Sequence, residues 1–225
     1  MISVELKQKA NTLLDEGKKK YEEGKNEEAL ELFNQALEVY RKNEDIDGEI
    51  AALGYIAVIY RLVNKSEKSV ETYTSLLKVF ENLHDVTAQG KVLNNMGLIN
   101  ARTGKYEDAL RNFNRALDIF KSVGNKQAVA DQFGNISSVY RDMKDYDKAV
   151  SACHDAMVIF KELHHLSGIG DQYSNMAYLY VMKGDLSNAL DWYKSAMPFY
   201  TEAGEKDKIS MTQQNIERLE KQGVV

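Results

Sequence analysis

The sequence predicts an all-α fold made of repeated helix pairs, and three observations support this prediction. The chain has 225 residues and one proline, so helix breakers are rare. Small and aromatic residues return every 40 positions along nearly the whole chain. Within each 40-residue unit, apolar residues follow the i, i+3, i+4 and i+7 spacing of amphipathic helices. Such units bury their apolar faces by stacking, which predicts an α-solenoid.

The repeat is clearest at three sets of aligned positions. The first helix of each unit contains a small residue: Gly17, Ala57, Gly97, Ser137 and Ala177. The second helix contains a small residue and then, four residues later, in most units an aromatic one: Ala29 and Phe33, Ser69 and Tyr73, Ala109 and Phe113, Ala149 and Cys153, Ala189 and Tyr193. Each unit closes with an aromatic residue: Tyr40, Phe80, Phe120, Phe160 and Tyr200. Because short side chains let two helices approach closely, we expect the small residues at the contact within each pair.

Five units are predicted in order, at residues 8–47, 48–87, 88–127, 128–167 and 168–205, so that residues 1–225 form one solenoid. The turn inside each unit carries Gly24, Asn64, Gly104, Lys144 or Gly184. Gly and Asn tolerate the left-handed conformation that ends helices, whereas Lys144 predicts a different geometry for the fourth turn. Residues 206–221 (KDKISMTQQNIERLEK) are predicted to form a single C-terminal capping helix.

Three positions predict details of the second helices. Asp145 and Asp185 stand where N-caps are expected. Pro198 lies late in the last second helix, where it lacks an N–H and clashes with the carbonyl of Lys194. We therefore expect a kink or an early end of the helix at Pro198.

The pattern G-x6-G-x-Y-x2-A-x3-F-x2-A, present as GLINARTGKYEDALRNFNRA at 97–116, resembles the tetratricopeptide repeat. The resemblance extends over about residues 3–221. It departs at the family's early Trp, which is replaced by Leu13, Leu53, Leu93, Phe133 and Tyr173, and at its closing Pro, which is absent. The 40-residue unit exceeds the common unit of about 34 residues. This longer form is similar to kinesin light chains, adaptors of cell-polarity complexes and bacterial peptide-pheromone receptors, which implies a right-handed superhelix.

An asparagine recurs on one stripe of the first helices, and the last of them falls in the capping helix: Asn95, Asn135, Asn175 and Asn215. At 100° per residue, Asn95 lies opposite the face of Leu93 and Gly97 that packs on the partner helix. First helices line the concave surface of a solenoid, so this stripe is predicted to face a groove. An Asn side chain can pair with a backbone C=O and N–H together, which suits an extended peptide. The alternative is a solvated face or hydrogen bonding between neighbouring repeats.

Further residues are predicted to line this groove: Tyr55, Lys91, Leu98, Arg102, Asp131, Asp171 and Tyr178. Lys91 and Arg102 make its middle basic, whereas Asp131 and Asp171 make its C-terminal half acidic. The predicted ligand therefore has mixed charge. A C-terminal carboxylate of the kind bound by chaperone-tail receptors is not expected, because Asp171 and Asn175 stand where that clamp requires Lys and Arg.

Composition disfavours other classes of function. The net charge is −5 and no basic stripe is present, which argues against nucleic-acid binding. The longest nearly apolar run, residues 50–60, is too short to span a bilayer, and the N-terminus lacks a signal-peptide core. Cys153 is the only cysteine and is expected to be a buried small hydrophobe. The four histidines, His84, His154, His164 and His165, are not spaced as a metal site.

The sequence thus predicts a non-catalytic, cytoplasmic scaffold that binds an extended peptide segment of a partner protein in its concave groove. No catalytic residue, cofactor, metal, membrane partner or nucleic acid is expected. Two alternatives remain open at this point: a structural module that homo-oligomerises, and a sensory or adaptor subunit of a regulatory complex.

Overall fold

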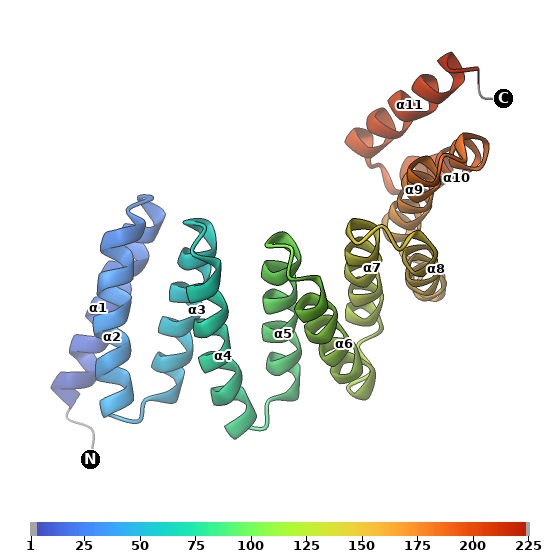
Figure 1. Cartoon of the computed structure of the whole chain (residues 1–225). Helices are drawn as coiled ribbons and strands as arrows, with labels where there is room; N and C mark the ends of the chain where they lie inside the picture. Colours follow the sequence, from blue (N-terminus) through green and yellow to red (C-terminus); the bar gives the residue numbers. More distant parts are fainter. Residues whose placement is uncertain (1–3, 224–225) are drawn as a thin grey trace. The chain divides into compact units, whose positions relative to one another are not determined.

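The computed structural model describes residues 4–223, which form eleven helices and no strand, in two compact units (Figure 1). Unit 1, up to Lys105, contains α1 (Val4–Glu22), α2 (Asn26–Lys42), α3 (Ile46–Leu62), α4 (Ser66–Asn82) and α5 (Val86–Arg102). Unit 2, from Tyr106, contains α6 (Tyr106–Ser122), α7 (Lys126–Asp142), α8 (Tyr146–Glu162), α9 (Leu166–Lys183), α10 (Leu186–Ala203) and α11 (Lys206–Lys221). We describe each unit by itself.

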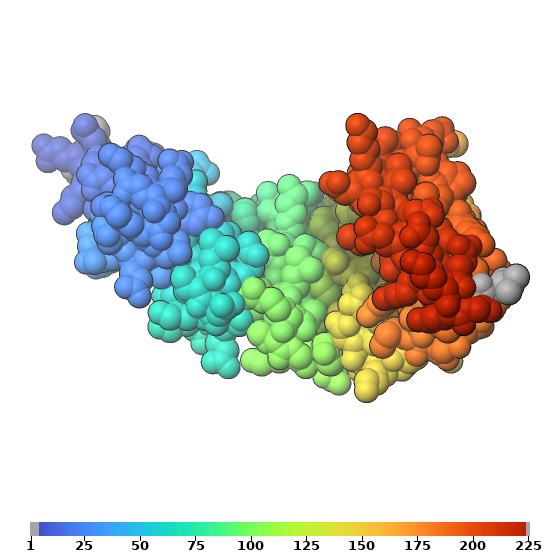
Figure 2. Space-filling model, turned by 90° about the horizontal axis from the view of Figure 1, so that it is seen from above, coloured from blue at the N-terminus to red at the C-terminus, as the bar shows by residue number. Residues whose placement is uncertain are grey.

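Consecutive helices pack on one another within each unit. In unit 1 the chain passes from α1 through α5 as neighbouring antiparallel helices (Figure 1). In unit 2 the same order holds from α6 to α10, and α11 packs on α10. In Figure 2 the red surface of the C-terminal helix lies against the orange surface of the residues that precede it. The prediction of five helix pairs and a C-terminal helix in an all-α repeat fold is confirmed. The third pair, α5 and α6, is divided between the two units.

Every turn between the helices has one residue in the left-handed region, and these residues are 20 positions apart. They are Gly24, Glu44, Asn64, His84, Gly104, Gly124, Lys144, His164, Gly184 and Gly204. At all ten of these turns the next residue's N–H donates to a carbonyl five positions back, as from Asp145 to Tyr140 over 2.9 Å. These bonds satisfy carbonyls that the helix end leaves without partners.

The fourth turn corrects one prediction. Lys144 has φ 62°, close to the φ 75° of Gly104, so a lysine adopts the conformation of the glycine turns. The turn therefore keeps its geometry, because packing of the two flanking helices outweighs the cost of a side chain in the left-handed region.

The structure also tests the predictions about where the second helices begin and end. Asp145 and Asp185 are N-caps, each accepting a hydrogen bond from the backbone N–H three residues on. The early end expected at Pro198 is wrong, since α10 continues to Ala203. A proline removes a single helical donor, and the buried Ala196 and Tyr200 on either side keep the helix packed on its neighbours.

Small residues lie at the helix contacts, as expected. Ala57, Ser69 and Ala149 are completely buried. The Ser69 hydroxyl donates to the Ala57 carbonyl over 2.7 Å, and the Ser137 hydroxyl donates to the Ala149 carbonyl over 2.8 Å. A side chain that reaches the backbone of the partner helix shows how closely the two helices approach in these pairs.

Candidate functional site

Unit 1 contains a hollow of about 620 Å³, here called the unit-1 hollow. It lies along α3 and α5, the first helices of their pairs, and side chains of α4 also line it. Its lining residues are Tyr21, Ile50, Ala51, Gly54, Tyr55, Val58, Tyr73, Leu76, Phe80, Asp85, Ala88, Lys91, Val92 and Asn95. Most of these side chains are apolar, so the hollow offers burial to an apolar group beside three polar ones, the acidic Asp85, the basic Lys91 and the amide of Asn95.

The aromatic wall of the unit-1 hollow is held by ring contacts. Tyr55 stacks on the buried Phe33, with ring centroids 4.7 Å apart and planes at 10°. Tyr21 meets Tyr55 edge to face at 5.9 Å. Offset stacking and edge-to-face contacts both orient rings, so the wall is preorganised. No ion pair involves Lys91 among the residues described in this unit, so its ammonium is available to an acidic group.

Unit 2 contains a second hollow of about 810 Å³, here called the unit-2 hollow. It lies along α7, α9 and α11. Its lining residues are Ala130, Asp131, Gly134, Asn135, Ser138, Phe160, Asp171, Gln172, Ser174, Asn175, Tyr178, Tyr193, Tyr200, Lys208, Met211, Thr212 and Asn215. This lining is far more polar than that of the unit-1 hollow.

The two hollows occupy equivalent positions of the repeat, offset by 80 residues. Nine positions recur in both linings: Ile50 and Ala130, Ala51 and Asp131, Gly54 and Gly134, Tyr55 and Asn135, Val58 and Ser138, Phe80 and Phe160, Lys91 and Asp171, Val92 and Gln172, Asn95 and Asn175. Gly, Phe and Asn are kept, whereas Ala51, Tyr55, Val58 and Val92 are replaced by polar residues in unit 2. One repeat geometry therefore forms two hollows of different chemistry.

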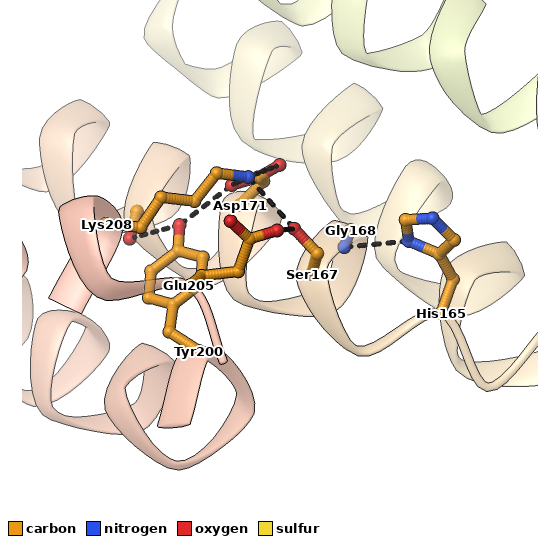
Figure 3. Close-up of polar contacts among 8 residues, drawn as sticks. His165, Ser167, Gly168, Asp171, Tyr200, Glu205 and Lys208 are labelled. Carbon is orange, nitrogen blue, oxygen red and sulfur yellow. Dashed lines mark hydrogen bonds and ion pairs between the residues drawn. The ribbon is translucent and has the colours of Figure 1, made fainter. Parts of the chain in front are cut away.

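The acidic side of the unit-2 hollow is partly neutralised by the terminal helix (Figure 3). Lys208 Nζ of α11 donates to both carboxylate oxygens of Asp171 on α9, each over 2.8 Å. The Tyr200 hydroxyl of α10 also donates to Asp171, over 2.9 Å, and burial raises the pKa of this hydroxyl. Lys208 donates further to Ser167, which donates to Glu205 over 2.7 Å. These contacts fasten α11 to α9 and give the Asp171 carboxylate three hydrogen bonds.

Asp131 differs from Asp171. No cation forms an ion pair with it among residues 106–223, and its carboxylate accepts a hydrogen bond from the Gln127 amide over 3.2 Å. Although Asp131 keeps access to solvent, desolvation raises the pKa of its carboxyl above the ordinary value of 3.8. The Gln127 hydrogen bond and the positive field of His165 oppose this shift. Asp131 is thus the acidic group of the unit-2 hollow that a cation would stabilise.

The structure places the predicted groove residues in three groups. Tyr55, Lys91 and Asn95 line the unit-1 hollow. Asp131, Asn135, Asp171, Asn175, Tyr178 and Asn215 line the unit-2 hollow. Leu98 and Arg102 line neither: Leu98 is an exposed residue of α5, and the Arg102 guanidinium donates to the Arg61 carbonyl over 3.2 Å.

Sequence reasoning missed two polar positions. Lys208 was expected only as part of a capping helix, although a lysine at the repeat position of Gly168 and Ala128 signals a changed environment. His165 is the N-cap of α9: its Nδ1 accepts from the Gly168 N–H over 2.9 Å, and its ring lies 5.4 Å from that of Phe160. Both residues hold helix ends in place around the unit-2 hollow.

The remaining reactive side chains form no site within residues 4–223. Cys153 is completely buried, and burial raises the pKa of its thiol from 9.0 to about 12, which keeps it protonated at neutral pH. The described His, Cys, Asp and Glu side chains nowhere gather in threes as metal ligands would. None of the described helices is both long and apolar enough to cross a membrane.

The repeat has a recognised counterpart. The sequence profile of the tetratricopeptide repeat matches residues 9–82, 49–122 and 129–202, well over half of the chain. The chain belongs to the tetratricopeptide repeat family. No curated protein has a matching sequence. Proteins of this fold are typically non-catalytic and act as protein-interaction scaffolds.

Solved structures of other tetratricopeptide repeat proteins share the fold at low sequence identity. The apo form of RapI matches with a TM-score of 0.76 at 16% identity, over 93% of this chain and 81% of its own. The kinesin light chain-like repeats of Podosopora anserina match with a TM-score of 0.70 at 11% identity, over 86% of this chain and 95% of theirs. A Rap protein complexed with competence and sporulation factor matches with a TM-score of 0.59 at 18% identity, over 96% of this chain and 65% of its own.

Proposed function

We propose that this protein is a non-catalytic scaffold that binds an extended peptide segment of a partner protein, with the unit-2 hollow holding the peptide main chain. One observation carries the proposal: Asn135, Asn175 and Asn215 come from three successive helices of the same type and line one hollow. An amide offers one acceptor and two donors, so the side chains of Asn175 and Asn215 can each pair with both polar groups of a peptide unit. A volume of about 810 Å³ lies within the range of known ligand sites.

The side chains around the amides supply specificity. Hydrogen bonds to the peptide main chain do not depend on which side chains the peptide carries. Selectivity among peptides must therefore come from the pockets that receive those side chains. Within the unit-2 hollow, Asp131 suits a basic side chain of the peptide. The Rap protein complexed with competence and sporulation factor is a relative in fold that also has a bound partner, which supports the proposal without fixing the ligand.

The first prediction tests the amides. Peptides selected from a random display library on the wild-type protein are expected to bind the Asn175→Ala/Asn215→Ala variant at least tenfold more weakly. Each amide contributes about 1 kcal/mol, and two such losses exceed the 1.4 kcal/mol of a tenfold change. Affinity is measured by calorimetry. The control is Asn114→Ala, an exposed amide on α6 that bonds its own helix at the Leu110 carbonyl.

Circular dichroism is the check on folding, and the helical content of the double variant is expected to equal that of the wild type. Equal affinity of the folded variant and the wild type for the selected peptides would contradict the proposal and move the binding surface elsewhere on the protein.

The second prediction concerns charge. Selected peptides are expected to carry Lys or Arg, and Asp131→Asn is expected to weaken their binding about fivefold or more, as loss of a charge-assisted contact does. Because the pKa of Asp131 is raised, its charge is lost at a higher pH than that of an ordinary aspartate. Affinity should therefore fall as the pH drops through this pKa in the wild type, whereas Asp131→Asn should lack this component.

Asp118→Asn, an exposed aspartate of α6, is the matched control. Peptides with Lys or Arg replaced by Glu should bind more weakly than their parents. If neither Asp131→Asn nor the replacement of Lys or Arg by Glu in the peptides changes the affinity, Asp131 does not select ligands by their charge.

A further inference from the structure

Gly54 and Gly134 are the central residues of their helices, α3 (Ile46–Leu62) and α7 (Lys126–Asp142). They stand at equivalent repeat positions, and each lines the hollow of its own unit. Glycine in a helix interior is destabilising relative to alanine, because it loses more backbone entropy on folding. Two glycines at such positions therefore need a compensating reason.

Packing does not provide that reason. A Cβ built on Gly54 or Gly134 would meet no heavy atom of another helix within 4 Å. By contrast, a Cβ on Gly170 would come within 2.7 Å of the Tyr200 ring, and one on Gly168 within 2.6 Å of the Phe160 ring. Neither Gly54 nor Gly134 has a positive φ, so backbone conformation does not require glycine there either. The space beside both glycines is open hollow.

The position of each glycine in its hollow is central. The residues four before and four after Gly134, Ala130 and Ser138, line the same hollow, and the Ser138 hydroxyl donates back to the Gly134 carbonyl over 3.1 Å. Gly54 is flanked in the same way by Ile50 and Val58. Each glycine thus interrupts a continuous stripe of side chains with a bare stretch of helix surface.

We propose that Gly54 and Gly134 are specificity-determining positions at which the main chain of a bound peptide lies directly against the helix. The inference rests on the proposed function. Glycine is the residue used where another backbone approaches closely. In unit 2 the bare surface adjoins Asn135 in the sequence and shares its hollow with Asn175, so a peptide lying on it is brought to the amides. A Cβ there would hold the peptide away from them.

Gly134→Ala is the decisive variant because its two expected effects have opposite signs. The unfolding midpoint in urea should rise, since alanine favours the helix and meets no neighbour. Affinity for the peptides selected on the wild type should fall about tenfold, as a misfit in a ligand site does. Asn114→Ala, which also raises helix propensity at an exposed site, should raise the midpoint and leave affinity unchanged.

A lower unfolding midpoint for Gly134→Ala would show that the glycine is structural and would overturn the inference, as would affinity equal to or tighter than that of the wild type. The Asn175→Ala/Asn215→Ala variant separates the two proposals. If it loses binding while Gly134→Ala does not, the peptide hollow stands and the glycine role fails. If both variants bind normally, the proposed function fails as well.

Discussion

Phe33→Ala is expected to lower the free energy of unfolding by about 3–5 kcal/mol, the usual range for truncating a buried phenylalanine. The Phe33 side chain is completely buried, and its ring fills the space left by Gly17, where a Cβ would come within 2.7 Å of it. The same ring supports Tyr55 by stacking. Truncation leaves a cavity between α1 and α2 and removes the support of the aromatic wall of the unit-1 hollow.

Urea denaturation followed by two signals measures this effect. Circular dichroism reports all helices, whereas fluorescence of Trp192, the only tryptophan, reports unit 2. Repeat proteins are stabilised mainly by neighbouring contacts, so the helical signal should shift further than the fluorescence. Phe33→Leu, which keeps most of the volume, is the matched control and should cost about 1 kcal/mol. A loss below 1 kcal/mol for Phe33→Ala would contradict the described packing.

The helix pairs were predictable from sequence because stacking imposes a period on the residues. An alanine or serine at each contact, such as Ser69 or Ala149, leaves a visible mark every 40 residues. The turns were less predictable. Glu44 and Lys144 adopt left-handed conformations that their residue types disfavour. The helices on either side are fixed by their buried faces, so the connection takes the conformation that joins them, whichever residue stands there.

For the candidate site, the sequence indicated which helix face the residues share, but not which partners the charged residues have. Helical geometry placed the Asn residues on one stripe, and three of them line one hollow. The state of each charge was not predictable. Asp171 and Asp131 look alike in sequence, yet Lys208, 37 residues away, pairs with the first and not with the second. Such a pairing depends on how α11 lies on its neighbours, and no local pattern encodes it. Arg102 likewise bonds a backbone carbonyl 41 residues away.

Gly48→Ala is expected to lower the free energy of unfolding by about 2–3 kcal/mol, as overpacking of a tight contact does. A Cβ on Gly48 would lie 2.2 Å from the ring of Tyr40. That ring is buried, and its hydroxyl donates to the Asn11 side chain over 2.9 Å, so it is held at both ends. Gly54→Ala, six residues later on the same helix, should instead stabilise the protein, because its Cβ meets open space.

A double variant tests whether the hydrogen bond between Tyr40 and Asn11 causes the loss of unfolding free energy expected for Gly48→Ala. The repeat positions equivalent to Gly48 in the next two units hold Ala88 and Ala128, and the facing aromatic positions hold phenylalanine, which has no hydroxyl to anchor. Tyr40→Phe should therefore release the ring from Asn11 and let it move away from the new methyl group. In a double-mutant cycle, Tyr40→Phe and Gly48→Ala should be less destabilising together than the sum of their separate effects, by about 1 kcal/mol. Simple additivity would mean that the backbones of α2 and α3, and not the hydroxyl, prevent the adjustment.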